Sequence, residues 1–142
     1  DFIFGGGLGF FHQCEILSRN IGKEINGYVC APCTPKDKDY GFVFEGCHFT
    51  NEGKMKDSVY LARPWRDDGK CLIVNCVFDD HIREEGYSDW GKENARRCSS
   101  FKEYQNKKTD GNKRVSWMKE TTKEDLCFIE EMLRRRNDER NL

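Results

Sequence analysis

The chain has almost no excess of either charge and no long apolar segment. Its 142 residues carry 24 lysines and arginines against 25 aspartates and glutamates, so no strong electric field points to nucleic acid or to a membrane surface. No apolar run approaches the roughly 18 residues that a membrane-spanning helix needs. We therefore expect a protein with no nucleic-acid partner and no membrane partner.

A starting methionine and a visible secretory signal peptide are also missing. The chain opens on DFIFGGG, which has the composition of a strand interior. We therefore expect the sequence to be a piece of a longer protein. Its length is enough for one domain with one core.

Cysteine, by contrast, is abundant. An even count of eight would fit disulfides in a secreted protein. The chain is nevertheless too long and too aromatic for a small disulfide-stapled scaffold, and reduced cysteine is a good small buried residue. We expect most of the cysteines to be free thiols. They are Cys14, Cys30, Cys33, Cys47, Cys71, Cys76, Cys98 and Cys127.

Short strands broken by turns account for most of the first hundred residues. β-branched and aromatic runs bounded by Gly, Pro, Asn and Asp predict strands. No convincing amphipathic helix separates these runs, which argues against a βαβ fold. The predicted strands span residues 2–4, 10–17, 27–30, 41–49, 59–61 and 71–78.

Three of these strands repeat one pattern, an apolar residue followed by x-x-Cys-x and a second apolar residue. The segments are FHQCEI, FEGCHF and IVNCVF, and their cysteines Cys14, Cys47 and Cys76 lie 33 and then 29 residues apart. Self-similarity at such a period indicates a solenoid, although three short strands can also resemble one another by chance. Strand-only repeats favour a parallel β-helix, in which these cysteines would form one inward-pointing ladder.

After Asp80 the chain becomes polar, with isolated aromatic residues, and we expect long loops laid over the side of the solenoid. The last segment predicts a helix capped by Thr121 or Thr122, with acidic residues in its first turn. Its apolar stripe would consist of Leu126, Ile129, Met132 and Leu133.

Two segments, DFIFG (residues 1–5) and LARPW (residues 61–65), resemble signature segments of the pectinesterase family. GYVCAPCTP, GFVFEGCHF, DDHI, FKEYQN and RVSW support the resemblance, which extends to about residue 118. It implies an all-β fold, a right-handed single-stranded parallel β-helix. Residues 1–118 would be the C-terminal coils of that domain, with the N-terminal coils missing, and residues 119–142 a helical tail.

The resemblance also implies the reaction and its residues. Asp1 would be the nucleophile that attacks a methyl ester of pectin, a methylated polygalacturonate, and releases methanol. Arg63 would pair with Asp1 and keep it ionised and aimed. Trp65 and Phe4 would contact the sugar, and Asp68, where the family often has Tyr or Thr, would alter which sugars are tolerated.

The chain departs from the family pattern in an important respect. The general acid of the family lies in an upstream Gln-Asp-Thr segment, together with the glutamines that stabilise the oxyanion, and this chain contains none of them. Each missing oxyanion donor would cost roughly 10²–10³ in rate. We therefore expect little activity from the chain alone.

Other functions remain open at this stage. A non-catalytic β-solenoid could bind acidic polysaccharide through Arg63 and Trp65, and an esterase for acetylated sugars could share the fold. We expect no cofactor and no metal, because Cys30-Ala-Pro-Cys33 lacks a βαβ setting and the histidines lack metal-ligand spacing. The complete protein would be a monomer that acts on pectin or methylated oligogalacturonate. Its location stays open, since the substrate favours secretion and the cysteines favour a cytoplasmic site.

Overall fold

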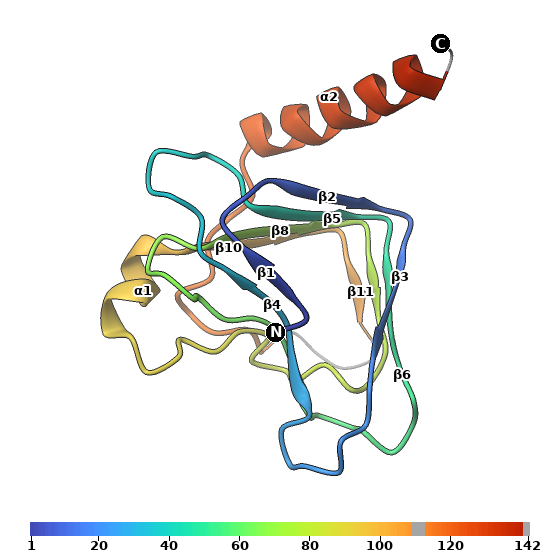
Figure 1. Cartoon of the computed structure of the whole chain (residues 1–142), viewed down its shortest axis with the longest axis vertical. Coiled ribbons are helices and arrows are strands. Elements are labelled where there is room, and N and C mark those ends of the chain that lie inside the picture. Colours follow the sequence, from blue (N-terminus) through green and yellow to red (C-terminus); the bar gives the residue numbers. More distant parts are fainter. Residues whose placement is uncertain (109–112, 141–142) are drawn as a thin grey trace.

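A computed structural model describes residues 1–108 and 113–140 of the chain, and its strands form three parallel sheets (Figure 1). The first sheet has the order β1 (Ile3–Gly5), β4 (Gly27–Pro32) and β7 (Val59–Ala62). The second runs β10 (Ser100–Tyr104), β8 (Lys70–Val74), β5 (Phe42–Glu45) and β2 (Gly9–His12). The third runs β11 (Lys107–Lys108), β9 (Val77–Phe78), β6 (His48–Asn51) and β3 (Glu15–Ser18).

Each of the first three coils contributes one strand to each sheet in turn, and the last coil adds β10 and β11 to the second and third sheets. The next coil then stacks in parallel register, with Ile3 opposite Cys30 and Phe11 opposite Phe44. Viewed down the molecule, the three sheets enclose a roughly triangular core (Figure 1). This arrangement confirms the predicted parallel β-helix.

Three of the predicted strands were wrong in their extent. The predicted strands 10–17, 41–49 and 71–78 are each two strands that meet at a sharp corner. One residue at each corner has the left-handed backbone conformation, which ends the strand although the apolar pattern continues through it. These residues are Gln13, Gly46 and Asn75, with φ of 53°, 66° and 55°.

The predicted cysteine ladder follows these corners. His48 N donates to Cys14 O and Val77 N donates to Cys47 O, so the three cysteines are stacked, and Cys47 and Cys76 are buried. Asn106 occupies the fourth rung. Its Oδ1 accepts from Cys76 N at 2.8 Å and its Nδ2 donates to Ile73 O at 2.9 Å. All eight cysteines of the chain are free thiols in this structure.

Aromatic rings fill the solenoid beside this ladder. The ring centroids of Phe11 and Phe44 are 4.8 Å apart, and those of Phe49 and Phe78 are 5.1 Å apart. The second pair links β6 to β9, so each coil packs on rings of the next. Stacking of equivalent apolar positions therefore supplies a continuous core.

The segment after Asp80 contains more regular structure than we predicted. It forms α1 (Glu93–Cys98), β10 and β11, and two isolated parallel bridges join Val59 to Ile82 and Ala62 to Tyr87. Only Phe101 of β10 is fully buried. A strand at the edge of a sheet carries polar side chains outward, so its sequence lacks the apolar alternation that marks the inner coils.

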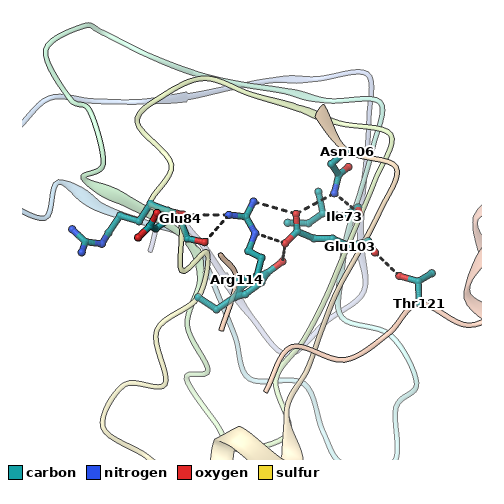
Figure 2. Close-up of polar contacts among 8 residues, drawn as sticks. Ile73, Glu84, Glu103, Asn106, Arg114 and Thr121 are labelled. Carbon is teal, nitrogen blue, oxygen red and sulfur yellow. Dashed lines mark hydrogen bonds and ion pairs between the residues drawn. The ribbon is translucent and has the colours of Figure 1, made fainter. Parts of the chain in front are cut away.

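A polar network ties the segment that follows residue 112 to this last coil (Figure 2). Arg114 Nε donates to Glu103 Oε2 at 2.7 Å, and Tyr87 Oη donates to the same oxygen at 3.0 Å. Asn106 Nδ2 donates to Glu103 Oε1 at 3.3 Å. The Glu103 and Arg114 side chains are only 12% and 10% exposed. The network therefore gives both oxygens of the nearly buried Glu103 carboxylate hydrogen-bond partners.

The chain ends in α2 (Lys123–Arg140), which crosses the outer face of the second sheet (Figure 1). Asp125 N donates to Thr122 Oγ1 and Thr122 N donates to Asp125 Oδ2, so Thr122 caps the helix as predicted. Ile129 is buried against the sheet, and Phe128 stacks on Tyr40 with ring centroids 3.8 Å apart. Neither described helix has the length and apolarity that crossing a bilayer requires.

Candidate active site

The first sheet brings Asp1 and Arg63 together from different coils. Asp1 precedes β1, Arg63 follows β7, and β4 lies between these two strands. Arg63 Nε donates to Asp1 Oδ1 at 3.0 Å, and Arg63 Nη2 donates to Asp1 Oδ2. This two-point geometry fixes the direction of the carboxylate as well as its distance.

Aromatic rings cover both faces of the Arg63 guanidinium. Its Cζ atom lies 3.7 Å from the ring centroid of Tyr28 and 3.7 Å from that of Trp90. Burial lowers the pKa of Arg63 from its ordinary value, and the neighbouring Tyr28 opposes that shift. Arginine stays charged through shifts of this kind, so the group remains a cation held between two π faces.

Trp65 and Phe4 form an exposed aromatic edge next to this pair. Their ring centroids are 5.6 Å apart in an edge-to-face arrangement, and the residues are 36% and 62% exposed. Trp65 N donates to Pro32 O at 3.0 Å, which anchors the ring's backbone to β4. Exposed rings of this kind offer a flat apolar surface to a ligand.

Asp68 lies on the turn that follows Trp65 and is half-buried. Within the described residues, no hydrogen bond or ion pair joins it to Asp1, Arg63 or Trp65. Burial lowers the pKa of Lys119 from its ordinary value, and the charge of Asp68 is among those that oppose this shift. Gly69 closes the turn, where a Cβ would lie 2.7 Å from Pro32 O. A contact between Asp68 and a sugar therefore stays a prediction.

Sequence reasoning missed three residues of this site: Tyr28, Trp90 and Lys92. Lys92 Nζ donates to Pro64 O at 3.0 Å and to Trp65 O at 2.8 Å, and it lies 4.7 Å from the Trp90 ring centroid. The register Ile3 to Cys30 places Tyr28 beside Asp1, so a strand alignment could have found it. No local sequence pattern predicts that Trp90 or Lys92 belongs to the site, because both residues lie in a loop.

An open hollow of about 430 Å³ lies beside Asp1. Its walls are largely apolar, and its polar lining residues include Asp1, Ser18, Arg19 and Asn26. The site thus combines an oriented carboxylate, a fixed cation and exposed rings. Such a combination can bind an acidic sugar and present a nucleophilic oxygen to it.

The family profile described as Pectinesterase matches residues 1–129 of the chain. The probable pectinesterase/pectinesterase inhibitor 58 of Arabidopsis thaliana is 30% identical over 125 residues, which cover 82% of this chain and 22% of that protein.

Solved structures agree with the profile. A pectin methylesterase from Yersinia enterocolitica has a TM-score of 0.72 at 25% identity, over 89% of this chain and 47% of the other. A pectin methylesterase from carrot has a TM-score of 0.78 at 24% identity, over 89% of this chain and 43% of the other. The chain thus spans less than half the length of each of these three proteins. It belongs to the pectinesterase family.

Proposed function

We propose that the chain carries the nucleophile and sugar-binding edge of an esterase that removes methyl groups from pectin. The observation that carries this proposal is the two-point pair between Asp1 and Arg63 beside the exposed ring of Trp65. The family resemblance assigns the nucleophile to Asp1, and the geometry here is compatible with that role. Methylated polygalacturonate, or oligomers cut from it, is the proposed substrate.

In the proposed reaction, an Asp1 oxygen attacks the carbonyl carbon of the methyl ester. The carbon–oxygen bond to the methoxy group breaks, and the methoxy group leaves as methanol after taking a proton. Water then adds to the resulting acyl-enzyme, which releases the uronate carboxylate and regenerates Asp1. Arg63 holds the attacking carboxylate in one direction, and positioning of this kind is the main source of rate for a weak nucleophile.

The reaction also needs a proton donor for methanol and hydrogen-bond donors for the oxyanion. The family resemblance places both sets of residues in segments that are not among these 142 residues. We therefore propose that the chain by itself has little activity, and that the longer protein performs the reaction.

Methanol release from methyl-esterified pectin tests this proposal. The 142-residue chain should be compared with a longer form that includes its natural upstream residues, and each form with its Asp1→Asn variant. Asp37→Asn, on an exposed turn away from the site, is the matched control. We expect release from the longer wild type and its control and almost none from Asp1→Asn. Full release by Asp1→Asn would contradict the proposal.

A non-catalytic role is the second candidate. The exposed rings of Phe4 and Trp65 beside a cation could bind acidic polysaccharide without any chemistry. Retention of pectin by both the short and the long forms, with no methanol from either, would favour this alternative.

A further inference from the structure

We propose that the loop of residues 88–92 positions the candidate site, with Trp90 and Lys92 holding Arg63 and Trp65 in their working orientation. This inference rests on the proposed function and adds two positioning residues to it. Neither residue is proposed to touch the reacting atoms.

Among the residues that the structure describes, the first sheet has no full fourth strand, whereas the other two sheets have one. Residues 82–88 run beside β7, and their last hydrogen bond to it is the one that Ser88 N donates to Ala62 O at 3.2 Å. Beyond this point the chain turns outward, and the carbonyls of Pro64 and Trp65 have no strand to pair with. Lys92 Nζ donates a hydrogen bond to each of these two oxygens. It thus replaces the hydrogen bonds of a missing strand.

Trp90 supplies the outer wall for Arg63. Tyr28 belongs to β4 and forms the inner face of the sandwich, so its position is set by the sheet. The second ring against the guanidinium is that of Trp90, whose centroid also lies 3.7 Å from the Arg63 Cζ atom and which belongs to a loop. Without that ring, the Arg63 side chain would gain rotational freedom and solvent access on one side.

Side-chain contacts hold the backbone of this loop in a fixed conformation. Trp90 and Gly91 both have left-handed backbone conformations, with φ of 59° and 69°. Such a conformation is unfavourable for a bulky residue and persists only where neighbouring contacts impose it. Asp89 provides them: its Oδ1 accepts from Gly91 N at 2.8 Å, and its Oδ2 pairs with Arg96 Nε at 2.8 Å.

Lys92 contacts both the Trp90 ring and the backbone of the segment that carries Arg63 and Trp65. Its ammonium group lies 4.7 Å from the Trp90 ring while it holds the backbone of Trp65. Because both of its oxygen partners belong to the Arg63-Pro64-Trp65 segment, a shift of Lys92 would disturb the cation and the sugar-binding ring together. Its ammonium is therefore engaged in positioning, and we assign it no direct contact with substrate.

Nuclear magnetic resonance of the full 142-residue chain tests the inference without requiring activity. The Nε–Hε signal of Arg63 should be displaced by the two rings and exchange slowly with water. In Lys92→Met and Trp90→Leu we expect it to move toward the position of exposed arginines, whereas Lys92→Arg, which can still donate to both carbonyls, should restore it. Lys56→Met, at an exposed position, is the control and should change nothing. An unmoved Arg63 signal in both loop variants would overturn the inference.

Methanol release by the longer form supplies a second readout. We expect kcat to fall roughly tenfold in Lys92→Met, as small misplacements of reacting groups do, with recovery in Lys92→Arg. A displaced Arg63 signal with unchanged kcat would also overturn the inference, because the loop would then hold Arg63 without serving the reaction. If no form releases methanol, the proposed function fails, and the Arg63 signal alone decides whether the loop positions this side chain. Urea unfolding of each variant separates a loss of positioning from a loss of stability.

Discussion

Asp1 and Arg63 lie 62 residues apart, yet two nitrogens of the Arg63 guanidinium donate to the two oxygens of the Asp1 carboxylate. The first sheet creates this relationship, because it stacks the starts of successive coils in parallel register. A rigid cation then determines where the carboxylate points.

Replacing Arg63 with lysine should remove the two-point contact while keeping a positive charge. A lysine ammonium cannot match both oxygens of the Asp1 carboxylate with a planar fork. One charge-assisted hydrogen bond contributes about 1.5–3 kcal/mol, so we expect kcat/KM for pectin to fall about 10- to 100-fold in the longer form. Arg134→Lys, at an exposed ion pair with Glu131 on α2, should leave kcat/KM unchanged. Equal activity of Arg63→Lys and wild type would show that a point charge suffices.

Trp65→Ala should weaken substrate binding more than it slows the chemical step. The exposed Trp65 ring contacts Phe4 but no charged group of the Asp1–Arg63 pair. We therefore expect KM to rise several-fold while kcat changes little, which steady-state kinetics on methylated oligogalacturonates would measure. Trp117→Phe, whose ring packs against Tyr87 and Phe101 away from the site, provides an aromatic control. A fall in kcat with constant KM would assign Trp65 a different role.

Removal of Arg114 should strongly destabilise the fold. Its partner Glu103 is nearly buried and would be left without a cation beside it (Figure 2). Breaking a buried pair in this way costs about 3–5 kcal/mol, so Arg114→Met should lower the urea midpoint markedly. Arg134→Met, in the exposed pair with Glu131, should change the free energy of unfolding by less than about 1 kcal/mol. Similar losses in both variants would contradict the importance of burial.

The attachment of α2 should weaken in acid. Burial of Asp125 acts to raise its pKa, but bonds from Lys102, the Thr122 backbone and Tyr40 outweigh it and lower the pKa below its ordinary value. A depressed carboxyl pKa contributes stability above the unfolded-state value of about 4, which is lost as pH falls through the folded-state pKa. The urea midpoint should therefore drop between pH 5 and pH 3 by less in Asp125→Asn than in wild type. An identical drop in both would show that other groups carry the acid sensitivity.

The sequence predicts the stacked coils well where the same residue type recurs at equivalent positions of successive coils. Cys14, Cys47 and Cys76 recur 33 and then 29 residues apart in one apolar pattern, and they form the expected ladder. Asn106 occupies the next position of this ladder, where side-chain hydrogen bonds replace a buried thiol. The cysteine pattern therefore did not predict the fourth coil. The corners were also missed, because a left-handed residue such as Gln13 leaves no trace in an apolar alternation.

For the site, the two family motifs predicted roles for Asp1, Arg63, Phe4 and Trp65, and these roles stay predictions, as does that of Asp68. The structure places Arg63 against Asp1 and Phe4 against Trp65. Trp90 and Lys92 could not be predicted in the same way. Their role depends on two left-handed residues and on the absence of a fourth strand beside β7, both of which are properties of the folded chain.

The most direct test of the account is to trap the acyl-enzyme during turnover. Hydroxylamine attacks a mixed anhydride, so adding it to the longer form as it releases methanol should leave a hydroxamate on the peptide that contains Asp1, detectable by mass spectrometry. We expect this label in wild type and in Asp37→Asn, and none in Asp1→Asn. Steady methanol release with the label on another carboxylate of the protein would contradict the claim that Asp1 is the nucleophile.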